Sequence, residues 1–411
     1  MPKRLRLIDL ITLNIFWIGL NFLWNSLHSI ILPVRILDLA PEHLKGTSLG
    51  LITFLGLILA MAYQPIIGAI SDASTLKWGR RRPFVLVGTF FNIVFLTLLL
   101  AAGNLWLLCA WYMLLQVSSN TAEGPYQGII PDLVPQDQRG EASGIKQIIE
   151  ILGAVLSTFM AGYLMERSLI WATAGVIIAA LLVSVVITAF TVHEQPGDEV
   201  KAKPLLSHAR DTFNIDVRQY SDYMWLVLSR FFIFVGLTAV QIFSLYFIKD
   251  VIGAPNYTEV TGSLTAIVGV GILLIVYPAG YLSDRVGRKP LLILSGLMAT
   301  AGVLLFLRAD SLTKLLIYGG IIGLAMGIFL SSNWAFATDL IPRAEAAKYM
   351  GISNVATAGG SAAARFGGPV LDFFNARQQG LGYRVLFMGI ALCFLLGALV
   401  LLRVRERRGP R

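Results

Sequence analysis

Charged residues are scarce in this chain: Asp, Glu, Lys and Arg make up 14% of its 411 residues, against about 25% in soluble domains. Hydrophobic residues account for 56%. Because so few polar side chains cannot cover a globule in water, the composition excludes an ordinary soluble protein. It predicts an integral membrane protein.

Cysteine and histidine are also rare, with two and four residues. Cys109 and Cys393 lie in apolar segments without the spacing of a metal or redox site, so we interpret them as ordinary apolar residues. The sequence has no recognisable nucleophile, metal-ligand or phosphate-loop motif. We therefore expect no enzyme activity, no cofactor and no metal.

Long apolar segments recur along the whole chain. A helix of about 20 residues crosses the roughly 30 Å of hydrocarbon in a bilayer. We place twelve such segments at 9–33, 47–71, 84–103, 105–130, 141–165, 169–192, 223–249, 260–283, 290–308, 313–338, 347–374 and 384–404. The predicted fold class is an all-α integral membrane protein with twelve transmembrane helices.

Basic residues predict the orientation in the membrane. When the N-terminus is placed in the cytoplasm, most of the 33 Lys and Arg residues fall in cytoplasmic loops, which is the distribution that sets insertion direction. Both termini then lie in the cytoplasm, and the protein itself is placed in a plasma membrane or a bacterial inner membrane. Topology and anionic lipid explain the net charge of +9, so we expect no nucleic-acid partner.

An internal repeat is the strongest signal in the sequence. The segment GAISDASTLKWGRRRP at 68–83 is matched by GYLSDRVGRKP at 280–290. Beyond these loops an offset of 207 residues pairs Pro83 with Pro290 and Asp132 with Asp339. We predict two pseudo-symmetric six-helix bundles, 1–192 and 223–411, joined by a cytoplasmic linker at 193–222, as in transporters whose halves rock around a central site.

These repeated loops resemble the loop motif of the major facilitator superfamily. Within it, SDASTLKWGRRRPF and NTAEGPYQGIIPDL are similar to the plant sucrose transporters, their animal relatives and the glycoside, pentoside and hexuronide cation symporters. The resemblance implies the major facilitator fold and alternating access. The sequence departs from the plant pattern at Gln116, where those proteins carry a proton-coupling Asp, and at Gln127, where they carry an Arg.

The loop motif predicts a latch on the cytoplasmic side. Gly68 and Gly280 would let helices approach closely, and Asp72 or Asp284 would meet an Arg or a helix N-terminus. The alternative is that the basic residues only fix topology. The predicted gating residues are Gly68, Asp72, Arg80, Arg81, Arg82, Asp132, Arg139, Gly280, Asp284, Arg288 and Asp339.

Polar residues form stripes on three predicted spans of the first half. Their spacing places each set on one helix face. The stripes are Gln116, Asn120, Glu123 and Gln127; Asn14, Asn21, Asn25 and His28, bordered by Trp17 and Trp24; and Gln147, Glu150 and Ser157. Interhelical hydrogen bonding would explain a single Asn, but the aligned set predicts a wet central cavity.

Two carboxylates lie at similar depth, roughly 12–14 Å from the cytoplasmic ends of their helices. Carboxyls sharing a desolvated site resist double ionisation, so one of them would hold a proton. We predict that Glu123 is the coupling acid, with Glu150 as its partner and His28 as a lesser candidate. The alternative for Glu150 is a salt bridge with Lys146 one turn away.

The second half does not repeat the polar stripe of 105–130. The offset of 207 residues places small, apolar and aromatic residues at the equivalent positions: Gly323, Gly327, Leu330 and Trp334. Sugars are bound by amide and carboxylate hydrogen bonds and by an aromatic face. The predicted substrate residues are Asn21, Trp24, Asn25, Gln116, Asn120, Gln127, Gln147, Gln241, Trp334, Asn354 and Arg365.

Together these features predict a proton-coupled importer of a sugar or glycoside, such as a disaccharide, with sodium as the other possible ion. We expect a monomer in the lipid bilayer. The main alternative is a proton-driven exporter of amphipathic drugs. The segment GIKQIIEILGAVLSTFMAGYL lacks the Gly-Pro motif typical of superfamily antiporters, which weighs against export. A non-transporting sensor or scaffold is a third class.

Overall fold

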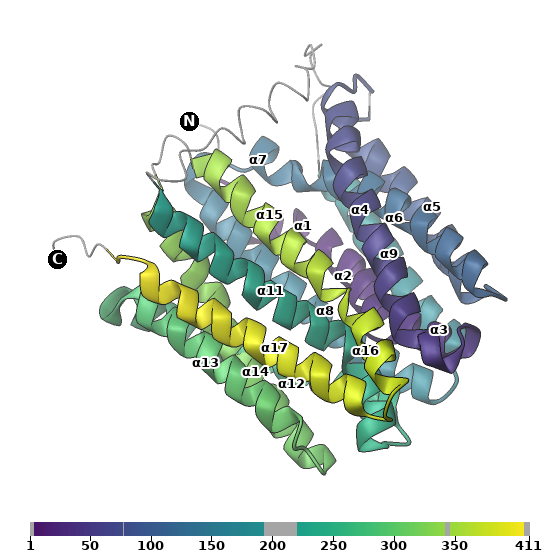
Figure 1. Cartoon of the computed structure of the whole chain (residues 1–411). Coiled ribbons are helices and arrows are strands. Elements are labelled where there is room, and N and C mark those ends of the chain that lie inside the picture. The colour runs from purple at the N-terminus through teal and green to yellow at the C-terminus, as the bar shows by residue number, and fades with distance from the viewer. Residues whose placement is uncertain (1–3, 77, 193–219, 342–345, 407–411) are drawn as a thin grey trace. The chain divides into compact units, whose positions relative to one another are not determined.

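The computed structural model describes residues 4–76, 78–192, 220–341 and 346–406. The described residues are almost entirely helical, without β-strands (Figure 1). A membrane explains this choice, because a helix satisfies all of its backbone hydrogen bonds internally. The predicted all-α class is confirmed.

The first six predicted spans correspond to nine α-helices. The first span is divided into α1 (Leu7–Thr12), α2 (Phe16–Ser26), a π-helical turn (Leu27–Ile31) and α3 (Leu32–Leu39). The others are α4 (Lys45–Asp72), α5 (Arg82–Leu100), α6 (Leu105–Gln127), α7 (Ile129–Leu133), α8 (Arg139–Glu166) and α9 (Ile170–Thr191).

The later spans begin with α11 (Ser221–Phe247), which also ends in a π-helical turn (Ile248–Ile252). The remaining helices are α12 (Tyr257–Val286), α13 (Arg288–Phe306), α14 (Leu312–Asp339), α15 (Ala346–Ala364), α16 (Gly367–Asn375) and α17 (Leu381–Val400). Short 3-10 turns lie at Glu42–Leu44, Gln136–Gln138 and Leu401–Arg403.

Ten helical segments in the described part of the chain are long and apolar enough to cross a membrane. The predicted spans 105–130 and 347–374 are helical but are not among the ten. The first is made less apolar by its polar stripe. The second is broken at residues 365–366, between α15 and α16, and Pro369 in the first turn of α16 has no N–H to bond back across this break. The count of twelve spans therefore stays a prediction.

The chain divides into two compact units. The first contains Met1–Glu42 and Leu51–Lys203, and the second contains His43–Gly50 and Pro204–Arg411. The start of α4 thus belongs to the second unit, although the predicted halves assign it to the first. The predicted bundle boundaries stay a prediction, and most of the linker 193–222 lies outside the described residues.

Small residues set the packing inside each unit. In the first unit α2 packs on α8 and α9, and in the second α17 lies between α11 and α13 (Figure 1). The glycines of span ten lie where α14 packs against α12: a Cβ on Gly323 would be 2.8 Å from the Cα of Val268. This contact gives a physical reason for small residues in place of a polar stripe.

Candidate substrate and gating sites

Two helices of the first unit join their polar residues into one cluster. Trp24 on α2 donates from Nε1 to Ser119 Oγ on α6 at 2.9 Å, and it stacks on His28 with ring centroids 5.1 Å apart. A ring nitrogen of His28 lies 2.9 Å from the Tyr112 hydroxyl, which also accepts a 2.8 Å bond from Gln116. His28 lies in the π-helical turn, a distortion that is frequent at functional sites.

The amides of α6 keep acceptor oxygens for another molecule. Asn120 donates to the backbone oxygen of Gln116 at 2.8 Å, and Gln116 donates to Tyr112. Both bonds use the amide NH2 group, so each side-chain carbonyl oxygen can still accept hydrogen bonds. On α2, Asn25 instead donates to the side-chain oxygen of Asn21 at 2.9 Å.

The two predicted proton-coupling carboxylates have different partners. Glu123 accepts a 3.0 Å hydrogen bond from Gln127. Glu150 forms the alternative ion pair with Lys146, at 3.6 Å, and Lys146 also lies 3.9 Å from the Trp17 ring centroid. Glu123 is within electrostatic reach of both Lys146 and Glu150. The three charges therefore form one group, near the C-terminal end of α6 and the N-terminal half of α8.

The other predicted substrate residues are more dispersed. Gln147 on α8 and Asn354 on α15 are exposed, Gln241 is half-buried on α11, and Trp334 on α14 is 45% exposed. Arg365 is buried just past the end of α15, where its guanidinium donates to the backbone oxygen of Ser361. A substrate role for these residues stays a prediction.

The second unit contains a polar cluster around Arg230, of which the predicted substrate residues include only Trp334. Arg230 on α11 donates from Nε to Thr357 Oγ1 at 2.7 Å and from Nη1 to Asn333 Oδ1 at 2.6 Å. Its guanidinium lies 5.2 Å and 5.5 Å from the ring centroids of Phe234 and Trp334. A charge within a predicted span was the available sequence signal.

Each unit has an equivalent cluster of ion pairs at its loop motif. Arg81 contacts Asp132 at 2.6 Å and Asp72 at 2.9 Å in the first unit. In the second, Arg288 contacts Asp339 at 2.9 Å and Asp284 at 3.3 Å. We call these the first and second charge triads.

The neighbouring basic residues bind backbone oxygens or the same carboxylate. Arg82 donates to Ala189 near the end of α9, and Lys289 donates to Leu402 and Val404 after α17 at 3.0 and 2.8 Å. Arg139 donates to Pro131 at 2.7 Å, and Arg80 donates to Asp132 at 2.7 Å. Burial alone would raise the pKa of Asp132, but hydrogen bonds from Arg81 and Arg80 hold it below its usual range.

The expected close helix approach at Gly68 is wrong for this structure. A Cβ added there would meet no described atom within 4 Å, whereas at Gly280 it would lie 3.0 Å from Ser331 Oγ. The glycines that the loop geometry does require are Gly79 and Gly287, with φ of 105° and 108°. A latch role for any of these loop residues stays a prediction.

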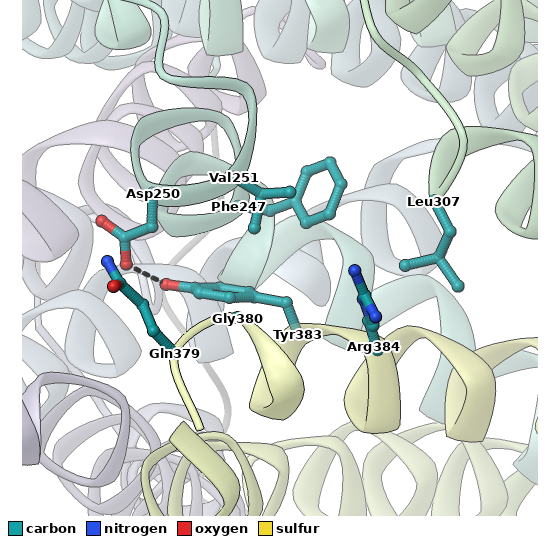
Figure 2. Close-up of a pocket in the computed structure, with 8 residues that line it drawn as sticks. All are labelled: Phe247, Asp250, Val251, Leu307, Gln379, Gly380, Tyr383 and Arg384. Atoms are coloured by element: carbon teal, nitrogen blue, oxygen red, sulfur yellow. Dashed lines mark hydrogen bonds between the residues drawn. The ribbon is translucent and has the colours of Figure 1, made fainter. Parts of the chain in front are cut away.

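The predicted external end of the second unit holds a further polar cluster. Lys45, at the start of α4, contacts Asp250 at 2.6 Å, and the Tyr383 hydroxyl donates to the same carboxylate (Figure 2). Asp250 and Tyr383 line a pocket of about 310 Å³, in which Gln379 lies beside Asp250 and Arg384 lies toward Leu307 (Figure 2). Within the described residues, no group of three or more His, Cys, Asp or Glu side chains could hold a metal ion.

Comparison with known families agrees with this architecture. The family model described as MFS/sugar transport protein matches residues 43–349. The chain belongs to this family. It is therefore a major facilitator transporter and a multi-pass membrane protein, and the predicted resemblance to sugar symporters is confirmed at the level of the family.

The relatives of this transporter are named for different functions. The multi-drug resistance efflux pump PmrA of Streptococcus pneumoniae is 23% identical over 96% of this chain and 98% of its own. The sucrose transport protein SUC3 of Arabidopsis thaliana is 29% identical over 39% of this chain and 30% of its own.

Solved structures show the same fold. The nucleoside transporter NupG has a TM-score of 0.72 at 15% identity, covering 97% of this chain and 100% of that one. A D-xylose–proton symporter has a TM-score of 0.72 at 17% identity, covering 98% of each chain. Together they confirm the predicted major facilitator fold.

Proposed function

We propose that this transporter is a proton-coupled symporter of a sugar or glycoside, such as a disaccharide. The observation that carries the proposal is the amide stripe of α6, where Gln116 and Asn120 direct their NH2 groups to their own helix and keep carbonyl oxygens as acceptors. Sugar hydroxyls are donors that match such acceptors. Trp24, half-buried beside this stripe, supplies the aromatic surface that suits the apolar face of a sugar ring.

We further propose that Glu123 carries the coupled proton. Its hydrogen bond comes from the neutral side chain of Gln127, whereas Glu150 already has a cationic partner in Lys146. A carboxylate without its own ion pair can gain and lose a proton without breaking one. Sodium is the second candidate ion, and His28 the second candidate proton site.

The remaining predicted residues keep secondary roles in this proposal. Asn21, Asn25 and Gln127 would extend the substrate site along α2 and α6, and the two charge triads would act in gating. We also propose that the transporter works as a monomer in a cell membrane, with both termini in the cytoplasm.

A proton-driven exporter of amphipathic drugs is the second candidate function. The similarity to PmrA supports it, because that pump is matched along nearly its whole length. The two functions differ in the direction of coupling. Under an inward proton gradient, a symporter accumulates its substrate inside, whereas an antiporter expels its substrate.

Purified protein in proteoliposomes separates these functions. We expect labelled sugars to accumulate under an inward proton gradient and an amphipathic cationic dye to show no gradient-driven movement. Glu123→Gln should abolish accumulation but keep sugar exchange at equal pH, because Gln retains the hydrogen-bonding shape of the protonated acid and cannot release a proton. Glu141→Gln, at an exposed carboxylate on the same side, is the matched control.

Two results would reject the proposal. Gradient-driven dye movement without sugar uptake would assign the exporter function. Near wild-type accumulation by Glu123→Gln would reject Glu123 as the proton carrier and move the role to Glu150 or His28.

A further inference from the structure

The Arg230 cluster places a positive charge inside the second unit, and the described residues of this unit supply no negative partner for it. Its hydrogen bonds go to neutral oxygens of Thr357 and Asn333, and within the described residues of this unit no carboxylate pairs with it. The single Asp in the described part of span 347–374, Asp372, instead accepts bonds from the backbone of Gly46 and Thr47. A charge in a span costs a few kcal/mol or more, and such residues normally mark a substrate or ion pathway.

Hydrogen-bond donors are in excess around this charge. A guanidinium has five N–H donors and no acceptor, and two of the nitrogens account for its bonds to Thr357 and Asn333. Asn333, 1% exposed, has a side-chain nitrogen without a partner among the described residues. An acceptor-only group such as a carboxylate or phosphate matches this surplus, and the planar fork of Arg binds both groups through paired bonds.

We propose that the Arg230 cluster binds a negatively charged substituent of the transported substrate, a carboxylate or a phosphate. The inference rests on the proposed sugar-transport function and narrows it from neutral sugars to acidic ones. Trp334, 45% exposed and adjacent to Arg230, gives the cluster a face that a ring can contact. The same positive charge disfavours cationic amphipathic drugs.

The test compares three probes of similar size in proteoliposomes: methyl β-glucuronide, glucose 6-phosphate and methyl β-glucoside. Wild type should transport one of the two acidic probes with a kcat/KM about 10- to 100-fold above that of the neutral one, the ratio expected for a charged hydrogen bond. Arg230→Gln should remove most of this preference, because it should lower kcat/KM for the acidic probe about 10- to 100-fold more than for the neutral probe. Arg308→Gln, at an exposed arginine of the same unit, is the matched control.

The outcomes separate this inference from the proposed function. Proton-driven transport of the glucoside alone keeps the proposed function and overturns the inference, and so does an equal loss of all probes in Arg230→Gln. Restoration of transport in Arg230→Gln by a second change, Glu123→Gln, would assign Arg230 as a counter-ion and also overturn it. Gradient-driven dye export without sugar transport rejects both proposals.

Discussion

The two charge triads allow one structural argument to be tested within a single chain. Arg81 has a side chain 9% exposed, and its partners Asp132 and Asp72 are 29% and 58% exposed. Its equivalent, Arg288, is 22% exposed, with partners that are 51% and 71% exposed. Because water screens exposed pairs, the first triad should contribute more to stability than the second.

The size of the difference follows from these exposures. A charged hydrogen bond with little solvent access, such as Arg81–Asp132, contributes about 1.5–3 kcal/mol, and exposed pairs such as Arg81–Asp72 contribute about 0–1 kcal/mol. Arg81→Gln should therefore lower the free energy of unfolding by about 1.5–4 kcal/mol. Arg288→Gln loses two exposed pairs, with Asp339 and Asp284, and should lower the free energy of unfolding by about 0–2 kcal/mol.

Equilibrium unfolding in mixed micelles, followed by tryptophan fluorescence, measures both variants. Gly128→Ala provides an independent check that keeps the charge, because its Cβ would lie 2.1 Å from the Arg81 guanidinium carbon and displace it. It should destabilise the protein by an amount similar to Arg81→Gln. Equal destabilisation by the Arg81 and Arg288 variants, or a larger effect at Arg288, would refute the reasoning from exposure.

Three further predictions concern single sites. The lowered pKa of Asp132 means that its ionised form stabilises the fold, so the stability difference between wild type and Asp132→Asn should be constant above pH about 4 and shrink as the pH falls through the lowered pKa; a difference that grows in acid would contradict this. Gly323→Ala should cost about 1–3 kcal/mol by overpacking against Val268, whereas Gly320→Ala, with its nearest atom at 3.5 Å, should be nearly neutral in the same unfolding assay. Tyr112→Phe removes the hydroxyl shared by His28 and Gln116, so it should raise the KM for sugar exchange severalfold; an unchanged KM would place this hydroxyl outside the site.

The internal repeat is the part of the sequence that predicted the most structure. The offset of 207 residues pairs Arg81 with Arg288 and Asp132 with Asp339, and each pair makes the same contact in its own unit. It also pairs Asn104 with Ser311, whose side chains cap the starts of α6 and α14. Local rules suffice here, because loop charges and helix caps act over a few residues.

The tertiary partners of polar residues could not be predicted in the same way. The helix period placed Gln116 and Asn120 on one face, but not that their NH2 groups would bond within their own helix. The π-helical turn at Leu27–Ile31, which contains His28, departs from the α-helical period and has no simple sequence signal. Arg230 was visible as a charge in a span, yet its role depends on Asn333 and Thr357, which are 103 and 127 residues away.

The two units share loop chemistry but differ in the chemistry of their spans. Both carry an Asp–Arg–Asp triad at the loop motif, as expected if each loop performs the same mechanical task. Inside the spans, the first unit holds Glu123 and Glu150 with one Lys, whereas the second holds Arg230 without a carboxylate partner among its described residues. A carboxylate can carry a proton and a cation can bind an acidic substrate, so this asymmetry suits a transporter that binds the two cargoes on different units. Exchanging the charges tests the division: Arg230→Glu should abolish transport of acidic sugars, and a neutral sugar still carried by this variant should remain dependent on the proton gradient through Glu123. If the variant instead loses proton dependence with the neutral sugar, the two tasks are not divided between the units and Arg230 belongs to the coupling machinery.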